Sequence, residues 1–292
     1  MDELATFEKV VIVIVNWERP GDTIRCIQSV KESDYSNSEI MLVDNGSKDE
    51  SVNEIRSSYD QLHVIELPQN LGFTGGYNTG IKKALEIGAK FVFLLNNDTI
   101  VEKNTISLLV NNRWDISVPK IVFQDAPNLI WAAGARWRSF PPTIKMIGYK
   151  KPDGPKYNLA KELEYATGCA LMIKKGVLDQ VGGFDERYVN YLEDYDFTYR
   201  AREAGFTIGY VPGAKVLHKV SSSLGVSSPQ RWHYLGRNTV LFFRHPDRFP
   251  SSLIWFVLGW IIIREIINGQ ARYIPDFWSG VKEGYRISKG AS

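Results

Sequence analysis

The chain has 292 residues, of which 44% are hydrophobic and 23% charged. This length and composition suit either one large α/β domain or a domain with an appendage, with an ample buried core. The 35 basic and 33 acidic side chains leave a formal charge of +2, which excludes a protein that binds nucleic acid by neutralising many phosphates. The two cysteines, Cys26 and Cys169, support neither a disulfide scaffold nor a zinc cluster. Because the N-terminal residues also lack the features of a signal peptide, we expect a cytoplasmic protein.

The first hundred residues alternate predicted strands with predicted helices. Continuous apolar runs, typical of strands buried on both faces of a parallel sheet, predict strands over 10–15, 40–43, 63–67 and 91–95. Apolar spacing and turn residues predict helices over about 20–33, 49–58 and 75–87. This alternation predicts an α/β fold in which helices cover a mostly parallel sheet.

The second half of the chain is less regular. Tryptophans and prolines between residues 104 and 161 predict irregular loops. Beyond them, the pattern predicts further elements: a strand over 165–173, helices over 175–181 and 191–204, a strand over 207–211 that Pro212 ends, and a helix over 230–244. The Ser/Gly-rich segment 221–228 is of the kind that orders over a ligand. The apolar run 253–263 is too short to span a membrane.

Polar residues directly follow three of the predicted strands. Asn16 follows the first, Asp44-Asn45-Gly46-Ser47 the second, and Asn96-Asn97-Asp98 the fourth. Open α/β sheets bind ligands at the carboxyl ends of their strands, so these side chains are candidates for a ligand site. An aspartate in such a place is more often a turn residue or a helix cap. The glycine-rich stretch 70–80 allows backbone to approach a ligand closely.

Taken together, these stretches resemble the inverting glycosyltransferases of family 2, which have the GT-A fold, and most of all their rhamnosyltransferase-like and galactofuranosyltransferase-like members. Six motifs in the family's order carry the resemblance: Val13-Ile14-Val15-Asn16-Trp17, Val43-Asp44-Asn45-Gly46-Ser47, Asn70-Leu71-Gly72-Phe73, Leu95-Asn96-Asn97-Asp98, Glu193-Asp194-Tyr195-Asp196-Phe197 and the segment 212–218. Any one alone is weak, but six in order are specific.

The resemblance implies a domain organisation and an activity. The GT-A catalytic domain would span residues 1–220, with a nucleotide-sugar-binding half over 1–103 and an acceptor-binding half over 104–220, and a C-terminal loop and helical region would follow over 221–292. Such an enzyme transfers a sugar, with inversion, from a UDP- or dTDP-activated donor. The acceptor would be a hydroxyl of a saccharide or lipid-linked saccharide, in the assembly of cell-surface or glycoprotein glycans.

The resemblance also implies roles for single residues. Asp98 matches the last acid of the family's Asp-x-Asp motif and would coordinate Mg2+ or Mn2+, with His218 as a further ligand. Asp194 would be the base for the acceptor hydroxyl, Glu193 would support it, and Glu193 and Tyr191 would contact the acceptor. The nucleotide-sugar pocket would use Asn16, Asp44, Asn45, Asn70, Gly72, Asn78, Asn96 and Asn97, with Asp44 reading the nucleobase.

Several assignments keep a structural alternative. Glu193 and Asp194 are also explained as an acidic first helical turn stabilised by the helix dipole, and His218 as a structural hydrogen-bonding residue. We expect Arg237 to approach the diphosphate from its helix. The segment 251–267 is either a helix at a membrane surface or an oligomer-forming core helix. Because similar enzymes act on lipid-linked acceptors, we favour peripheral attachment to the cytoplasmic membrane face.

Two other functions compete with this interpretation. A dinucleotide oxidoreductase requires G-x-G-x-x-G directly after a strand, but Asn16-Trp17-Glu18-Arg19-Pro20-Gly21 follows the first strand and the glycines at 75–80 have the wrong spacing. A catalytically weak or inactive sugar-nucleotide-binding relative rests on Asn96, which replaces the first acid of the metal motif. The presence of Asp98, Asp194 and His218 weighs against this alternative.

Overall fold

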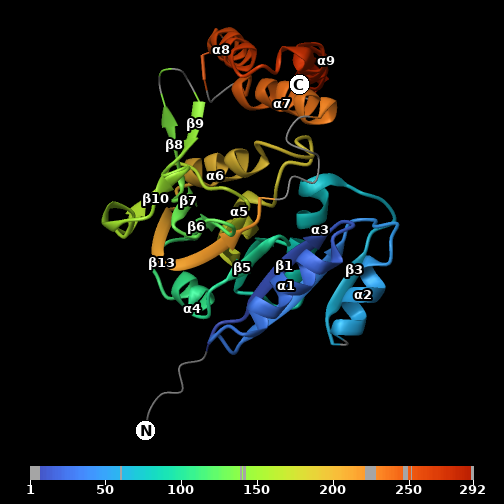
Figure 1. Cartoon of the computed structure of the whole chain (residues 1–292), viewed down its shortest axis with the longest axis vertical. Coiled ribbons are helices and arrows are strands. Elements are labelled where there is room, and N and C mark those ends of the chain that lie inside the picture. The colour runs from blue at the N-terminus through green and yellow to red at the C-terminus, as the bar shows by residue number, and fades with distance from the viewer. Residues whose placement is uncertain are drawn as a thin grey trace.

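The structure is a computed structural model that describes residues 7–59, 61–138, 140, 143–220, 228–245, 249–250 and 252–290. The first half forms parallel strands in the order β3-β2-β1-β4 (Figure 1). Its strands are β1 (Val10–Asn16), β2 (Ser38–Asp44), β3 (His63–Glu66) and β4 (Phe91–Asn96). The helices between them are α1 (Pro20–Lys31), α2 (Ser51–Ser58) and α3 (Gly72–Glu86). The predicted alternation is therefore confirmed.

The core lies on both faces of this sheet because successive side chains of a strand point in opposite directions. Val11 and Val13 of β1 belong to a buried cluster that includes Tyr77 of α3. Their neighbours Ile12 and Ile14 belong to a second cluster, with residues of α1 and α2. Burial on both faces explains why β1 is an unbroken β-branched run rather than an alternating one.

The second half extends the same sheet with mixed strand directions. β12 (Ala170–Lys174) pairs antiparallel with β4 and β6 (Ile116–Phe123), while β13 (Ile208–His218) runs parallel to β6 and antiparallel to β5 (Thr99–Val101). The smaller strands are β7 (Leu129–Ala132), β8 (Ala135–Arg138), β9 (Thr143–Met146), β10 (Lys151–Pro152) and β11 (Lys161–Glu162). The helical segments are α4 (Thr105–Val110), η1 (Pro155–Tyr157), α5 (Lys175–Val181) and α6 (Glu193–Glu203). The α/β class with a largely parallel central sheet is confirmed.

The irregular loops predicted between residues 104 and 161 are wrong at Trp131 and Trp137, which lie in β7 and β8. The same segment contains β6, a central, almost fully buried strand, while Pro141 and Pro142 lie outside the described residues. The end predicted for the strand at Pro212 is also wrong, because β13 continues to His218. The second error has a local cause. Val211 pairs with Pro119, and the register of β13 against β6 shifts between Val211 and Lys215. Such an irregularity accommodates prolines, which lack the N–H that a regular ladder needs.

The C-terminal helices are α7 (Pro229–Phe243), α8 (Leu253–Ile267), η2 (Ala271–Tyr273) and α9 (Ile274–Gly290), and they lie together at one end of the molecule (Figure 1). They share a third apolar cluster with the β8–β9 hairpin and α6. Within the described ranges, no helix combines the length and the apolar character needed to cross a membrane. The loop predicted to order over a ligand, 221–228, lies outside the described residues apart from its last position.

Glycines allow α7 and α9 to pack at very short range. A Cβ added to Gly280 of α9 would lie 1.9 Å from the His233 carbonyl oxygen, and one added to Gly236 of α7 would lie 2.1 Å from that of Phe277. These neighbours are backbone atoms, which cannot move aside as a flexible side chain does. The position of α7 therefore depends on the absence of side chains at this contact.

We predict that Gly280→Ala forces the two helices apart and lowers the free energy of unfolding by about 2 kcal/mol, as overpacking typically does. Gly259→Ala on α8 is the matched control, because a Cβ added there meets no atom within 4 Å. The control should raise stability by about 0.5–1 kcal/mol, the helical preference for alanine over glycine. Urea denaturation measures both changes; equal effects of the two substitutions would contradict the packing argument.

Candidate active site

A cleft of about 140 Å³ opens at the carboxyl ends of β1, β2 and β4, beside the start of α3. Six predicted site residues line it: Asn45, Asn70, Gly72, Asn96, Asn97 and Asp98. Six further lining residues were not predicted as site residues: Val15, Trp17, Arg19, Phe73, Tyr77 and Asn190. The cleft occupies the edge of the sheet at which α/β proteins bind ligands.

A chain of buried hydrogen bonds connects the three strand ends. Asn97 Nδ2 donates to Thr23 Oγ1 at 3.0 Å, and that hydroxyl donates to Asn16 Oδ1 at 2.7 Å. Asn16 Nδ2 then donates to Asp44 Oδ1 at 2.9 Å. Ser47 completes the chain, since its hydroxyl and backbone N–H donate to the two oxygens of Asp44 at 2.6 and 2.9 Å. Asn16 and Asp44 therefore lie behind the cleft wall and fix its floor.

Asn45 and Asn70 shape the loop that leads into α3. Asn45 Nδ2 donates to the Gly72 carbonyl at 2.9 Å, and the Leu71 N–H donates to Asn45 Oδ1 at 2.9 Å. The Gly72 N–H donates to Asn70 Oδ1 at 2.8 Å. Gly72 has a φ of +74°, and an added Cβ would lie 2.5 Å from Val189 Cγ1. Only glycine satisfies this backbone conformation and this close approach together.

The glycines farther along α3 approach a strand rather than the cleft. A Cβ added to Gly80 would lie 2.2 Å from Val13 Cγ1, and one added to Gly76 would lie 2.9 Å from Val15 Cγ1. Close packing of α3 on β1 places Tyr77 at the back of the cleft, where its hydroxyl donates to Asn96 Oδ1 at 3.1 Å. Among these glycines, Gly72 lines the cleft and Gly76 and Gly80 do not, so the expected approach of backbone to a ligand stays a prediction for Gly72.

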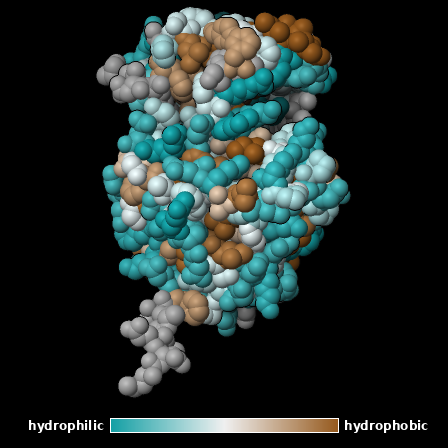
Figure 2. All heavy atoms as spheres, turned by 90° about the vertical axis from the view of Figure 1, so that its left-hand side faces the viewer, coloured by the Kyte–Doolittle hydropathy of each residue, from teal (hydrophilic) through white to brown (hydrophobic). Residues whose placement is uncertain are grey.

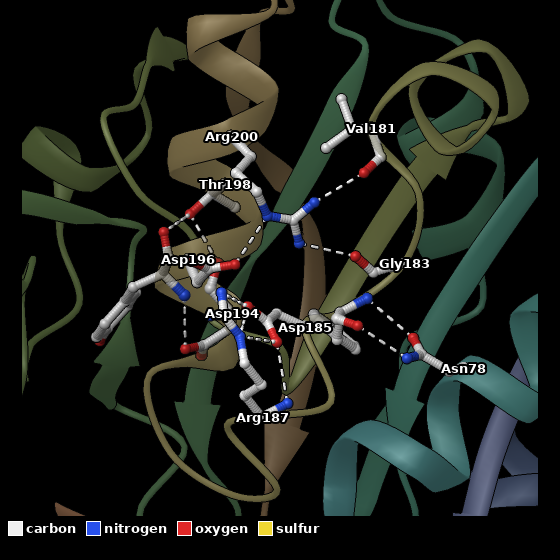
Figure 3. Close-up of polar contacts among 11 residues, drawn as sticks. Asn78, Val181, Gly183, Asp185, Arg187, Asp194, Asp196, Thr198 and Arg200 are labelled. Atoms are coloured by element: carbon white, nitrogen blue, oxygen red, sulfur yellow. Dashed lines mark hydrogen bonds and ion pairs between the residues drawn. The ribbon is translucent and has the colours of Figure 1, made fainter. Parts of the chain in front are cut away.

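The structure places Asn78 away from the cleft. Its side chain exchanges two hydrogen bonds, both 2.8 Å long, with the backbone of Phe184, and its Nδ2 lies 3.2 Å from Glu186 Oε1. Figure 3 shows that the Asn78 amide and the Arg200 guanidinium of α6 both form hydrogen bonds with the loop that follows α5. Arg200 donates to Asp196 and to the carbonyls of Val181 and Gly183, each at 2.8 Å. Asn78 thus ties α3 to the loop before α6, and the predicted nucleotide contact has no counterpart in this arrangement.

Asp98 and His218 form a buried pair beside the cleft. The pairing of β5 with β13 sets Thr99 opposite His218, which brings His218 Nε2 within 3.2 Å of Asp98 Oδ1. The two residues are 7% and 6% exposed. The His218 ring also meets Trp131 edge to face, with ring centroids 4.6 Å apart. Among the described residues, His218 Nδ1 finds no hydrogen-bond partner.

This pair fits a Mg2+ or Mn2+ ion in the chemistry of its donor atoms. A carboxylate oxygen is a ligand that both ions favour, whereas an imidazole nitrogen suits transition metals, so the presence of His218 favours Mn2+ over Mg2+. The described part of the chain holds no cluster of three or more His, Cys, Asp or Glu side chains suited to a metal. Mg2+ is usually bound by one or two carboxylates together with substrate phosphates and water, so two protein ligands match an ion that is shared with a diphosphate.

Glu193 and Asp194 occupy the first turn of α6. The Gly168 N–H donates to Asp194 Oδ2 at 2.9 Å, and the Tyr195 N–H donates to its Oδ1 at 2.8 Å. Burial raises the pKa of Asp194 to about 6, although these N–H groups act in the opposite direction. Burial, followed by the charge of Asp194, holds the pKa of Glu193 well above its usual range. Glu193 Oε2 is buried without a partner among the described residues.

The acid pair and the Asp98 site are connected through the end of β4, because the Gly168 N–H donates to Asp194 and the next carbonyl, that of Cys169, accepts the Asn96 N–H at 2.9 Å. Burial raises the pKa of the Tyr77 phenol well above its usual value, and the charges of Asp98 and Glu193 add to that effect. Asp194 and Asp98 likewise both raise the pKa of Cys169, after burial. One compact region therefore holds a carboxylate that titrates near neutral pH and a buried carboxylate–imidazole pair. Such a region can accept a proton and bind a cation.

The structure also shows which site residues the sequence did not reveal. Trp17 and Arg19 follow the end of β1 directly and could have been found by their position. Asn190 had no such signal, because it reaches the cleft from a loop far along the chain, where its Oδ1 accepts the Phe73 N–H at 3.2 Å. The expectation that Arg237 approaches the diphosphate is wrong, because Arg237 does not line the cleft. It is 6% exposed and donates to the Tyr188 carbonyl at 2.7 Å.

Comparison with known proteins supports this description. The chain is 27% identical over 295 residues to the low-salt glycan biosynthesis hexosyltransferase Agl10 of Haloferax volcanii, covering 96% of this chain and 92% of that protein. It is 25% identical over 252 residues to the N-acetylglucosaminyl-diphospho-decaprenol L-rhamnosyltransferase of Mycobacterium tuberculosis (strain H37Rv), covering 77% and 81% of the two chains.

Solved structures show the same fold. The mannosyltransferase PcManGT of Pyrobaculum calidifontis, in complex with GDP-Man and Mn2+, superimposes with a TM-score of 0.57 at 13% identity and covers 98% of this chain and 80% of its own. GalNAc-T7 with UDP, GalNAc and Mn2+ gives a TM-score of 0.63 at 17% identity, over 92% of this chain and 58% of its own. The predicted GT-A fold is confirmed.

The family model for glycosyl transferase family 2 matches residues 10–182. This match covers more than half of the chain and includes the strand ends that form the cleft. The chain therefore belongs to glycosyl transferase family 2, as its motifs predict.

Proposed function

We propose that this protein is an inverting, divalent-cation-dependent glycosyltransferase that moves a sugar from a UDP- or dTDP-activated donor to a hydroxyl of a saccharide or lipid-linked saccharide. Its role would be in the assembly of cell-surface or glycoprotein glycans. The observation that carries the proposal is that two sites meet at the end of β4. Asp194, with a pKa of about 6, accepts the Gly168 N–H, and the adjoining Cys169 carbonyl accepts the Asn96 N–H, two residues before Asp98, which lies 3.2 Å from His218.

Other cleft residues support a nucleotide-sugar donor. Trp17 lines the cleft beside Asn45 and Asn70 and offers an aromatic face to a nucleobase. Asp44, to which the resemblance assigns the nucleobase N–H, is 3% exposed and accepts protein hydrogen bonds on both oxygens, so in this arrangement it supports the floor beneath the donor. Arg19, also on the cleft, is suited to a diphosphate.

The comparisons support the acceptor and the cation. The M. tuberculosis relative is named as a rhamnosyltransferase acting on a decaprenol diphosphate-linked sugar, and a lipid-linked acceptor follows here by analogy. Both solved relatives contain Mn2+ together with a nucleotide or nucleotide sugar. In this chain Asp98 and His218 would hold the ion. When bound, it would act as a Lewis acid that stabilises the charge of the departing diphosphate.

The proposed reaction is a single displacement. Asp194 accepts the proton of the acceptor hydroxyl while the hydroxyl oxygen bonds to the anomeric carbon of the donor. The bond between that carbon and the diphosphate oxygen breaks at the same time, and the nucleoside diphosphate leaves with the electron pair. Attack from the opposite face inverts the configuration. Glu193, whose raised pKa favours a neutral carboxyl group, and Tyr191 would contact the acceptor.

A sugar-nucleotide-binding protein without turnover is the second candidate. It rests on Asn96, whose Oδ1 accepts the Tyr77 hydroxyl and which brings no charge to the cation site. The pairing of Asp98 with His218 disfavours this candidate. These two buried side chains lie 3.2 Å apart and still offer a cation two ligands, although Asn96 supplies no negative charge. Release of free sugar from a bound donor would separate the enzyme from the binding protein.

Cation-dependent donor binding gives the test of the proposed function. We predict that UDP- or dTDP-sugars raise the melting temperature of the protein more in Mn2+ than in EDTA, because a ligand of the folded state stabilises it. Asp98→Asn should weaken nucleotide binding in Mn2+ by about tenfold or more, the loss typical of a disturbed metal site. The control is Asp179→Asn, which removes an exposed ion pair with Lys175. An unchanged difference between Mn2+ and EDTA in the Asp98 variant would contradict its role.

The role of Asp194 as the base leads to a separate prediction about the pH dependence of catalysis. A base must be ionised to accept a proton, so kcat/KM should rise with pH through the pKa of Asp194, about 6, and level off above it. Asp194→Asn should remove this rise and lower kcat by about 10³-fold, within the range for general base catalysis. Calorimetry should show a donor Kd within about threefold of the original, because Asp194 does not line the donor cleft. Loss of donor binding, or a retained pH dependence, would show that another group is the base.

The exposed face of α8 supports contact with a membrane surface. Trp255, Phe256, Ile263 and Ile267 are 61%, 48%, 53% and 77% exposed, and Figure 2 shows apolar side chains gathered at the end of the molecule that carries the C-terminal helices. Amphipathic helices with such residues bind the boundary between lipid headgroups and acyl chains. This surface would bring the cleft to lipid-linked acceptors.

We predict that the full chain pellets with anionic liposomes. A Trp255→Ser, Ile267→Ser double variant should bind them at least about tenfold more weakly, because each substitution removes apolar side-chain area that the membrane would bury. Lys282→Ser on α9, an exposed residue, is the control for a general change in surface. Size-exclusion chromatography without liposomes tests the other interpretation. A dimer that the double variant converts to a monomer, with no liposome binding by either protein, would favour an oligomer interface.

A further inference from the structure

The loop before the acid pair has an unusual backbone. Val189, Tyr191 and Leu192 have φ values of 59°, 71° and 68°, in the left-handed region that residues other than glycine rarely adopt. Each such residue raises the energy of the loop, and most of all the β-branched Val189. A conformation of this kind persists only where the surrounding structure holds it in place. The loop 188–192 lies between α3 on one side and α7 on the other.

On the side of α7, the buried side-chain amide of Asn238 forms hydrogen bonds with several carbonyl groups of the loop 188–192. Asn238 is fully buried, and its Nδ2 lies 2.8, 2.5 and 2.7 Å from the carbonyl oxygens of Tyr188, Asn190 and Tyr191, so its two N–H groups are shared among three acceptors. The neighbouring Arg237 donates through Nη2 to the Tyr188 carbonyl at 2.7 Å and through Nε to Asn238 Oδ1 at 3.0 Å. The second bond fixes the orientation of the amide, with its NH2 group toward the loop.

On the side of α3, backbone N–H groups hold the same loop. The Thr74 N–H donates to the Val189 carbonyl at 3.1 Å, and the Phe73 N–H donates to Asn190 Oδ1 at 3.2 Å. Gly72 leaves the space that Val189 occupies. The loop therefore has two functional ends. Its Asn190 side chain lines the donor cleft, and its last residue, Leu192, is followed directly by Glu193 and Asp194.

We infer that Asn238, oriented by Arg237, is a positioning residue for catalysis. It holds loop 188–192 in its strained conformation and thereby sets the start of α6, with Glu193 and Asp194, against the donor cleft. Asn238 touches neither the cleft nor the acid pair, and it lies outside the matched family region, 10–182. The inference deepens the proposed function, on which it rests for the meaning of a fall in kcat.

A role in stability alone makes a different prediction from a role in positioning. If Asn238 only stabilises the fold, its loss lowers the amount of folded enzyme and leaves the kcat of the folded fraction unchanged. If it positions the loop, kcat falls in enzyme that remains folded, and the fall is reduced when the strain of the loop is removed. Val189→Gly removes the strain at one of the three left-handed positions, because glycine adopts a positive φ at no steric cost.

The test is a cycle of Asn238→Ala, Val189→Gly and the double variant, measured at a temperature where each is folded. We expect Asn238→Ala to lower kcat at least tenfold. The donor KM should change less than fivefold, because eleven of the twelve cleft-lining residues lie outside the loop. Val189→Gly alone should leave kcat within threefold, and in the double variant it should restore kcat by about tenfold, the equivalent of the cost of one left-handed residue.

The control is Thr239→Val on the same helix, which removes a buried hydroxyl that donates to the Leu235 carbonyl of its own helix at 2.7 Å. It should leave kcat within twofold. Equal losses in the Asn238 and Thr239 variants, or no recovery in the double variant, would overturn the inference. If Asn238→Ala does not fold, the double variant still decides: recovery of folding with kcat near the original supports positioning, and recovery of folding without activity overturns it.

This cycle and the proposed base fail in distinguishable ways. Full activity in the Asp194→Asn variant would remove the proposed base but leave the coupling between positions 238 and 189 intact. Loss of that coupling, with Asp194→Asn inactive, would remove the positioning role and leave the base in place.

Discussion

The candidate site depends on a constraint that buried polar groups impose: each must find a hydrogen-bond partner inside the protein. At the carboxyl edge of the sheet the partners are one another. Asn97, Thr23, Asn16 and Asp44 form a continuous chain that crosses from β4 through α1 to β1 and β2. Removing one member would leave its neighbour unpaired at a cost of about 1–3 kcal/mol. The three strand ends, and the cleft above them, are therefore fixed relative to one another.

The second half of the chain adds the reactive groups to this edge. His218 reaches Asp98 because β13 continues past its irregularity at Pro212 and pairs with β5. Asp194 reaches the site because the strained loop 188–192 is held between α3 and α7. Burial then gives Asp194 its chemistry, since it raises the pKa of this carboxyl group to about 6. The fold, more than any single contact, makes this carboxylate basic enough to accept a proton.

The parts that the sequence predicts correctly are those in which one residue type has one physical role. Unbroken β-branched runs form β1 and β2, and polar residues at their ends reach the cleft or its floor. The parts that it does not predict depend on partners far along the chain. Asn78 occupies a helix that borders the cleft, but the position of Phe184 decides where its amide points. No local pattern marks Asn190 or Asn238, because they act on backbone groups of a loop whose left-handed residues are not glycines.

Asn96 shows how a neutral substitute changes the proposed reaction without removing it. Its amide oxygen accepts the Tyr77 hydroxyl, which remains a donor because the pKa of that phenol lies well above its usual value. A carboxylate at this position would add another negative charge to a region that already holds Asp98 and Asp194. Those charges would repel one another until a cation arrived. With Asn96 this repulsion is smaller, but the protein offers a cation fewer charged ligands, so the diphosphate must supply the rest. Cation and donor should then each strengthen the binding of the other, as thermodynamic linkage requires of two ligands that share one site.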